Sequence, residues 1–163
     1  MANAFMSLGK ILGESTQQGF KDYIEVQSWD WEIEAETSWT KGGGASVGKP
    51  VPGKLRWEHF FDTTSTHILG FVCAGKAFPE VILKMCKTSP DAKPEPYFTA
   101  TMSGAFITKV SNAATEEGNI AQQVEMVFKH IKIEYRRQNE KGGLMAPAYF
   151  EWDIPAGTAS PSA

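Results

Sequence analysis

The stretch that decides the fold is residues 13–34, GESTQQGFKDYIEVQSWDWEIE. In its second half apolar and polar side chains alternate, with Ile24 and Val26 on the apolar face, which is the period of a half-buried β-strand. From Trp29 onward the apolar residues take the opposite parity. A slip of one residue would turn the tryptophans to solvent unless an extra residue re-aims the strand, so we predict a β-bulge near residues 27–28.

The part of the strand after the slip separates an apolar face from an acidic one. The apolar residues, which we predict to pack in the core, are Trp29, Trp31 and Ile33, and the acidic ones are Asp30, Glu32 and Glu34. Alternate residues on one strand face lie about 7 Å apart, a separation that glycosidase carboxylates use. A catalytic pair, however, has one member in an apolar pocket, so a continuous acidic row favours a solvated face over an active site.

The remaining pattern predicts a mainly β fold with one helix. Residues 120–136 repeat the slipped alternation, with the slip at Lys129 and His130, and this indicates a second bulge. Asp62 is a suitable N-cap for a helix over Thr63–Ala74, and Gly75 is a suitable stop. Two long bent strands, several shorter ones and this helix predict an antiparallel β-barrel of roughly eight strands with one flanking helix.

Residues 36–53 are predicted to form an extended loop, because they hold five of the fifteen glycines and two prolines. A loop of this length inside a compact domain is usually functional or disordered, so an arm that reaches a neighbour and a disordered excursion are both open. Trp39 favours contact with a partner, because a tryptophan in a solvated loop would otherwise expose a large apolar surface.

The length of 163 residues suits one domain, which we place at residues 1–155 with a disordered small-residue tail at residues 156–163. The net charge of −3 disfavours nucleic-acid binding, which needs a basic face. Cys73 and Cys86 are too few for a disulfide scaffold and indicate buried thiols in a reducing compartment. No leader peptide or membrane span is expected.

No pattern for a metal, a cofactor or a nucleophile is present. The three histidines have no ligand spacing with each other or with the cysteines; they are His59, His67 and His130. There is no nucleophile elbow and no phosphate loop. We therefore predict a protein without enzymatic activity and without a cofactor.

Several motifs together resemble those of the Hcp family, the tube protein of bacterial type VI secretion systems. They are F-x-x-x-G-x-x-x-G-E-S at Phe5 to Ser15, I-x-V-x-S-W-x-W at Ile24 to Trp31, the Asp62 and Gly75-Lys76 that flank the helix, and an aromatic strand near residues 149–154. The resemblance covers nearly the whole chain. One departure is Glu32, where many members of the family have a glycine after Trp-x-Trp.

The resemblance implies a barrel that assembles into homohexameric rings. These rings stack into a tube inside a contractile sheath, tipped by a VgrG spike, and the lumen holds small effectors. It also implies a protein made in the cytoplasm and secreted through the apparatus without a signal peptide. The candidate lumen-facing residues are Ser28, Asp30, Glu32 and Glu34, and the candidate inter-ring residues are Trp39, Gly42, Gly43, Gly44, Gly48, Pro50 and Pro52.

Two other classes of function remain open from the residues themselves. A barrel that binds a small ligand needs an interior cavity, whereas a core filled by large side chains leaves none; the candidates to fill it are Trp29, Trp31, Trp57, Met126 and Phe128. A carboxylate-dependent hydrolase, the less favoured class, needs one member of the acidic row to titrate well above the ordinary value of about 4.3.

Overall fold

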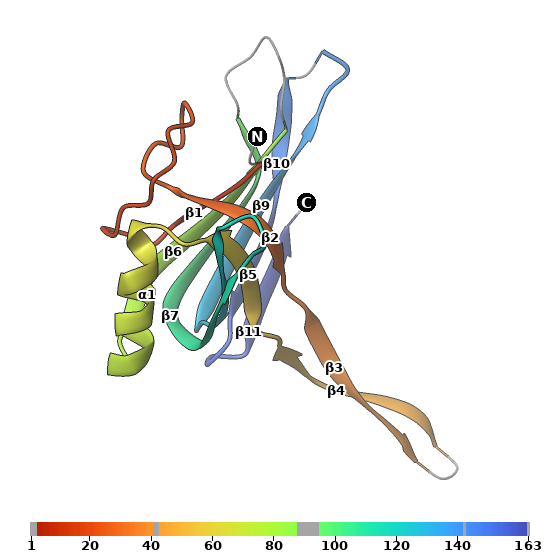
Figure 1. The fold of residues 1–163 in the computed structure, drawn as a ribbon. Coiled ribbons are helices and arrows are strands. Elements are labelled where there is room, and N and C mark those ends of the chain that lie inside the picture. The colour runs from red at the N-terminus through yellow and green to blue at the C-terminus, as the bar shows by residue number, and fades with distance from the viewer. Residues whose placement is uncertain (1–2, 41–42, 88–94, 142, 163) are drawn as a thin grey trace.

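The computed structural model describes residues 3–40, 43–87, 95–141 and 143–162. Within these ranges the chain forms strands and one helix (Figure 1): β1 (Ala4–Ser7), β2 (Ile24–Asp30), β3 (Ile33–Thr40), β4 (Gly44–Pro52), β5 (Leu55–Phe60), α1 (Thr63–Ala74), β6 (Ala77–Cys86), β7 (Pro96–Ala114), β8 (Ile120–Val127), β9 (His130–Gln138), β10 (Leu144–Asp153) and β11 (Thr158–Ser162). No helix in the described part of the chain is both long and apolar enough to cross a membrane.

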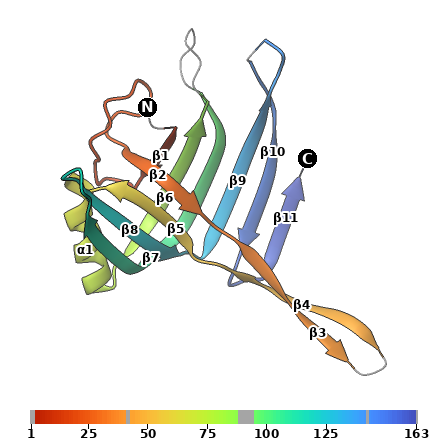
Figure 2. The same ribbon diagram turned by 45° about the vertical axis from the view of Figure 1, so that its right-hand side comes forward.

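The strands form a closed antiparallel barrel with additional strands at one side, as the sequence predicts. Their order is β11-β10-β9-β7-β6-β1-β2-β5-β8, and β8 also pairs with β7, which closes the ring. The strands β9, β10 and β11 extend from the barrel as a flap (Figure 2). The sequence predicts roughly eight strands in the barrel. Among the described residues, the closed ring contains β1, β2, β5, β6, β7 and β8, and the flap contains the other three strands of this sheet.

The long strand β7 makes the barrel corner. Its first half pairs with β9 and its second half with β8 on the same edge. Between the halves Gly104 has a φ of 60°, and a Cβ on it would lie 3.2 Å from the Lys129 side chain. The backbone N–H of Lys129 donates to the carbonyl oxygen of Ser103 at 3.1 Å. The prediction of a bulge inside one strand at Lys129 and His130 is therefore wrong: the chain passes there from β8 to β9.

The slip near residues 27–28 is confirmed as an irregularity between Val26 and Ser28, where β2 pairs with β5. The strand does not continue to Glu34, however. It ends at Asp30, and β3 belongs to a separate two-stranded sheet with β4.

Residues 36–53 are consequently not a loop, because most of them form the β3–β4 hairpin that projects from the barrel (Figure 1). The glycines and prolines that suggest a loop are tolerated here, since both strands are edge strands of a two-stranded sheet. Ile33, which the sequence places in the core, is 44% exposed at the start of this hairpin.

The barrel interior is filled by large side chains. Trp57, Met126 and Phe128 are buried as predicted, whereas Trp29 and Trp31 are half-buried and pack against the cluster. The fully buried members include Met6, Ile24, Ile68, Phe78, Val81, Leu83, Met102 and Val124.

The helix has the predicted boundaries. The Asp62 carboxylate accepts a hydrogen bond from the Thr64 backbone N–H at 2.8 Å, and the Ser65 hydroxyl accepts one from the Asp62 N–H at 3.0 Å. Gly75 ends the helix in the left-handed region. Ile68 is buried against the barrel, so the helix is stabilised by docking, as expected for so short a segment.

The C-terminal segment departs from the expected disordered tail over residues 156–163. Thr158–Ser162 form β11, which pairs antiparallel with β10, while residue 163 lies outside the described residues. The hydrogen bonds between strands are made by the backbone and need no large side chains. A strand of small residues therefore shows no hydrophobic pattern by which the sequence could predict it.

Candidate functional site: a charged barrel face and a projecting arm

The structure separates the four candidate lumen residues into two groups. Ser28 and Asp30 lie on the barrel strand β2, whereas Glu32 lies in the connection and Glu34 on the hairpin strand β3. All four side chains are exposed. The sequence predicts one continuous acidic row, but the end of β2 at Asp30 divides it.

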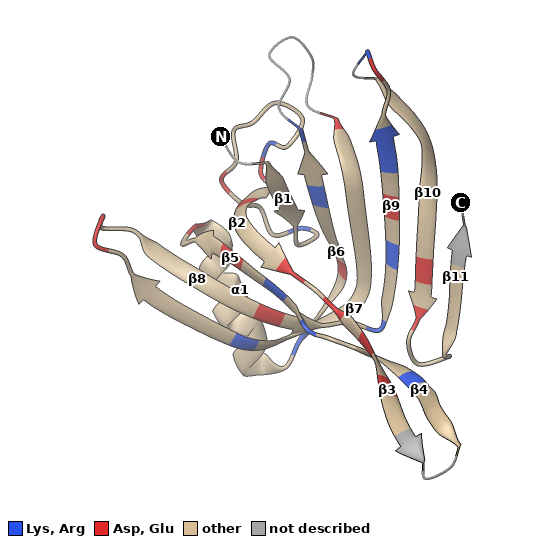
Figure 3. Ribbon diagram, turned by 90° about the vertical axis from the view of Figure 1, so that its right-hand side faces the viewer, with Lys and Arg blue, Asp and Glu red and all other residues tan. Residues whose placement is uncertain are grey.

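On the barrel, Asp30 is one end of a row of alternating charges that crosses four strands. The register places Asp30 opposite Arg56 on β5, Arg56 opposite Glu125 on β8, and Glu125 opposite Lys109 on β7. Figure 3 shows these alternating charges across the strands. Opposite charges on neighbouring strands stabilise the register by about 0.2–1 kcal/mol per pair.

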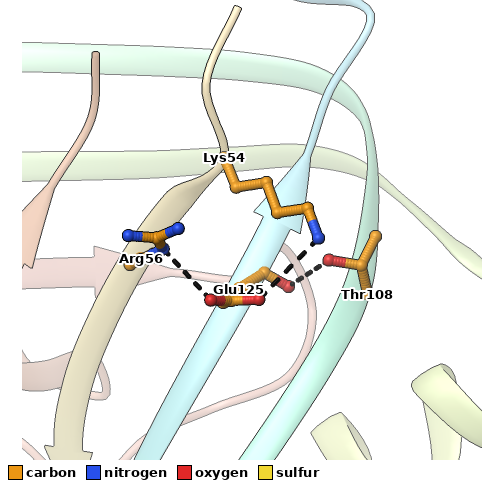
Figure 4. Close-up of polar contacts among 4 residues, drawn as sticks. All are labelled: Lys54, Arg56, Thr108 and Glu125. Atoms are coloured by element: carbon orange, nitrogen blue, oxygen red, sulfur yellow. Dashed lines mark hydrogen bonds and ion pairs between the residues drawn. The ribbon is translucent and has the colours of Figure 1, made fainter.

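The centre of the row is Glu125, whose carboxylate binds two cations (Figure 4). Arg56 Nε lies 3.0 Å from one oxygen and Lys54 Nζ lies 3.8 Å from the other. The Thr108 hydroxyl donates to the Glu125 carbonyl oxygen at 3.3 Å. Because both cations are about half exposed, solvent screens the pairs and their contribution to stability is small.

A hollow of about 210 Å³ lies over this face and is lined by Ser28, Trp29, Asp30, Arg56, Trp57, Glu58, Gln123, Val124 and Glu125. Typical small-molecule sites enclose about 300–1,000 Å³ and are mostly apolar. This hollow is smaller and lined by charges, so it suits contact with a polar macromolecular surface better than capture of a ligand.

The barrel interior and the acidic row do not provide the sites that the two alternative functions need. The barrel interior is filled by buried side chains, which leaves no room for a ligand there. The three carboxylates of the acidic row are exposed and lack the apolar pocket that a catalytic acid needs. Within the described ranges, no group of three or more His, Cys, Asp or Glu side chains could hold a metal ion.

The root of the hairpin is fixed to the barrel by its own backbone. The Gly53 N–H donates to the Glu32 carbonyl oxygen at 2.8 Å, and the Trp31 indole N–H donates to the Gly53 carbonyl oxygen at 3.1 Å. The Trp31 ring packs against Phe128, with 5.7 Å between ring centroids. A Cβ on Gly53 would lie 2.8 Å from the Glu32 carbonyl oxygen, so only glycine fits this close approach.

The hairpin has two different faces. Ile33, Ala35 and Thr37 alternate along β3 with Glu34, Glu36 and Ser38, so the two sets point to opposite sides. The first set lies opposite Pro52, Pro50 and Val47 of β4. Val47 is 71% exposed and Ile33 is 44% exposed, so an apolar face is uncovered in the single subunit.

The candidate inter-ring residues are distributed along this hairpin. Trp39 pairs with Ala45 through the backbone, but its side chain and Gly42 lie outside the described residues. Gly43 and Gly44 are at the turn, where Gly44 has a φ of 79°. Gly48, Pro50 and Pro52 lie on β4.

A buried polar network at the barrel–helix junction is not evident from the sequence. His59 has no exposed surface. The indole N–H of Trp57 donates a hydrogen bond to Nδ1 of His59 at 2.9 Å. The imidazole proton of His59 is therefore on Nε2, which donates to the Ser65 hydroxyl at 3.2 Å. Burial lowers the pKa of His59 below its usual 6.5, while the Asp62 charge and the Gln122 side chain oppose that shift. The only sequence signal is the Trp-x-His alternation directly before the Asp62 helix cap.

The two cysteines are free thiols in the structure: Cys73 is exposed and Cys86 is buried. Burial raises the pKa of Cys86 to about 11. The prediction that both thiols are buried holds for Cys86 and is wrong for Cys73, which is exposed near the end of α1.

Comparison with known proteins gives one family match. A family model described as "Type VI secretion system effector, Hcp" matches residues 5–135. No curated protein sequence matches the chain.

Solved structures show the same fold. A protein titled "Structure of a type six secretion system protein" has a TM-score of 0.89 and 21% identity, covering 98% of this chain and all of that one. Hcp1 from Salmonella typhimurium has a TM-score of 0.77 and 28% identity, with 98% and 100% coverage. A type VI secretion system effector from Yersinia pestis has a TM-score of 0.70 and 22% identity, covering 93% of this chain and all of that one.

Proposed function

This chain belongs to the Hcp family of type VI secretion proteins, and we propose that it is the structural subunit of the inner secretion tube. Six copies form a ring, rings stack into a tube, and the tube carries and exports effector proteins without catalysing a reaction. The observation that carries this proposal is the β3–β4 hairpin, which projects from the barrel with an uncovered apolar face (Figure 1).

A tube subunit has to be rigid, and the closed, filled barrel meets that requirement. The pairing of β8 with β7 leaves no open edge in the ring of strands, and large side chains occupy its interior. A packed interior of this kind resists deformation. It also favours a structural role over the binding of a small ligand inside the barrel.

The hairpin is the proposed arm that contacts the next ring. A two-stranded hairpin is marginally stable in water unless another surface covers it, and this one has an exposed apolar side. The root contacts of Trp31 and Gly53 hold it at a fixed direction to the barrel. The residues proposed for the contact remain Trp39, Gly42, Gly43, Gly44, Gly48, Pro50 and Pro52.

The charged face of the barrel is the proposed lumen wall. Ser28 and Asp30 lie on it, and Glu32 and Glu34 continue from it to the arm. Because Arg56 lies opposite Asp30 and binds Glu125, this wall carries positive as well as negative groups. We therefore infer cargo with mixed polar surfaces, in place of the basic cargo that an unbalanced acidic row would select.

The further partners in this proposal are the VgrG spike, the contractile sheath and the effectors. The subunit is made in the cytoplasm and leaves the cell through the apparatus. These partners are inferred from the family alone, and no contact in the single subunit is assigned to them.

The test of the assembly is size-exclusion chromatography with light scattering. We expect a mass near six times the 17.9 kDa of one chain. A mass of one chain at every concentration would overturn the proposal.

The test of the arm shortens the hairpin at a register pair. Residues 36–49 are replaced by Asn-Gly between Ala35 and Pro50, which pair directly, and this dipeptide forms a tight hairpin turn. We expect intact rings that no longer stack and are not secreted. Lys49→Gln, which keeps the arm length, is the matched control; stacking at the wild-type level in the shortened variant would exclude the arm.

A further inference from the structure

One corner of the barrel beside α1 gathers exposed apolar side chains from three segments. They are Leu12, Phe60, Phe61 and Ile120, which are 58%, 43%, 37% and 44% exposed. The Phe61 N–H donates to the Ile120 carbonyl oxygen at 2.8 Å, and the Thr63 hydroxyl donates to the Leu12 carbonyl oxygen at 3.0 Å. These contacts join the segments into one surface.

The rim of this surface is acidic. A hollow of about 150 Å³ is lined by Glu14, Ser15, Glu25, Gln27, Phe60, Phe61 and Asp62. Glu14 and Glu25 are exposed, and neither forms an ion pair with another residue of the described ranges. We call this surface the acidic corner, and define it by Leu12, Glu14, Glu25, Phe60, Phe61 and Ile120.

The other side of the subunit carries a surface of complementary chemistry. Lys87 Nζ lies 5.1 Å from the ring centroid of Tyr97, whose ring meets that of Tyr135 edge to face at 6.3 Å. An Arg137 guanidinium nitrogen donates to the Met145 sulfur at 3.6 Å. Tyr135 and Met145 are 46% and 42% exposed. These five residues form the cationic edge, and in the described part of the chain neither cation has a carboxylate in an ion pair.

The two surfaces face different directions. The acidic corner lies beside the start of α1, whereas the cationic edge lies on β7, β9 and β10, and directly after β6, at the opposite side of the barrel (Figure 2). A contact between two different patches of one chain is head to tail, and such contacts generate rings when the rotation closes. The hairpin points away from both surfaces (Figure 1) and remains free for contacts along the tube.

We propose that the acidic corner of one copy docks on the cationic edge of the next copy in the ring. This inference rests on the proposed ring assembly and names the two surfaces that build it. The apolar rings and the methionine supply the desolvated centre of the contact, while the charged rims select the partner and its orientation.

The experiment reverses the charge of each surface separately. The corner variant is Glu14→Lys with Glu25→Lys, and the edge variant is Lys87→Glu with Arg137→Glu. All four side chains are exposed, so both variants are expected to keep their wild-type melting temperatures. Each variant alone has two surfaces of the same sign, and we expect ring assembly to weaken by about tenfold or more, measured by light scattering against concentration.

Mixing the two variants in equal amounts distinguishes a broken interface from a broken fold. In the mixture each reversed corner meets a reversed edge, so rings of alternating copies should form again at the wild-type mass. Glu80→Lys, an exposed reversal on β6 away from both surfaces, is the control and should leave the mass unchanged.

The outcomes separate this inference from the proposed function. Wild-type rings in either reversed variant, or a mixture that stays dissociated, overturn the corner–edge contact and leave the tube proposal intact. A wild-type protein that is a single chain at every concentration overturns the tube proposal itself.

Discussion

The indole N–H of Trp31 donates a hydrogen bond to the carbonyl oxygen of Gly53, 3.1 Å away. This bond joins the first residue after β2 to the first residue after β4 and closes the root of the projecting hairpin. The direction of the arm thus depends on one half-buried tryptophan that also packs against Phe128.

Replacement of Trp31 by Phe should uncouple the arm from the barrel. The variant keeps an aromatic ring beside Phe128 but loses the N–H donor, so we expect about 1 kcal/mol lower unfolding free energy and weaker ring stacking. Denaturant unfolding and electron microscopy of assembled tubes measure the two effects. Trp29→Phe, which loses a donor to the Met85 sulfur at 3.0 Å, is the control and should leave ring stacking unchanged. An equal loss of ring stacking in both variants would contradict the assignment to Trp31.

A methyl group at position 53 should be costly. Gly53→Ala places a Cβ 2.8 Å from the Glu32 carbonyl oxygen, and we expect about 1–3 kcal/mol of destabilisation as the hairpin root shifts. Gly70→Ala is the matched control, since its Cβ would meet nothing within 4 Å. Because Gly70 lies inside α1, its replacement should stabilise the protein by up to about 1 kcal/mol. A Gly53→Ala variant as stable as the wild type would refute the close approach.

The stability of the protein should fall in mild acid because of His59. Its pKa is lowered in the fold, so the unfolded chain takes up the proton first. The free energy of unfolding is therefore unaffected well above the ordinary pKa of about 6.5 and decreases as the pH falls below it, until the folded-state pKa is reached. Urea unfolding at intervals between pH 8 and pH 5 measures this slope.

A comparison of two histidine variants isolates that contribution. His59→Gln should be less stable at pH 8, and its unfolding free energy should depend less on pH below pH 6.5. His67→Gln, at an exposed position, should keep the wild-type dependence on pH. An unchanged slope in His59→Gln would show that other groups produce the pH dependence.

The charged row on the barrel should contribute little to stability. Arg56→Ala removes the 3.0 Å ion pair with Glu125, and for an exposed pair we expect a loss of less than about 1 kcal/mol that shrinks further in high salt. A double-mutant cycle with Glu125→Ala measures the coupling. Asp62→Ala, which removes the cap of α1, should cost about 0.5–2 kcal/mol with little salt dependence; a larger and salt-independent Arg56 effect would contradict the screened geometry.

Features that depend on neighbouring residues were accessible from the sequence. The cap at Asp62 and the stop at Gly75 define α1 through contacts within one or two turns. The change of parity after Val26 likewise indicates a bulge, because side-chain alternation is a local property. These elements, together with the family motifs, are sufficient to predict the barrel.

Features that depend on the partner strand were not accessible. A parity slip looks the same whether the strand bulges, as between Val26 and Ser28, or ends, as β8 does at Val127. The second strand ends because β8 and β9 pair with different parts of β7, and β7 lies elsewhere in the sequence. The hairpin and β11 were hidden for a related reason, since their pairing uses backbone groups that small residues and glycine supply equally well. The His59 network needs β5 and α1 to be packed together before it exists.

The open edge of the flap determines how the subunit responds to mechanical load. In the described part of the chain β11 is bonded to β10 alone, so tension applied at the C-terminal end acts first on the backbone bonds of that one pair. Within the described residues each strand of the closed ring has at least two bonded neighbours, so such a load is shared there. Tension at the C-terminal end would therefore separate β11 from β10 before it opens the barrel.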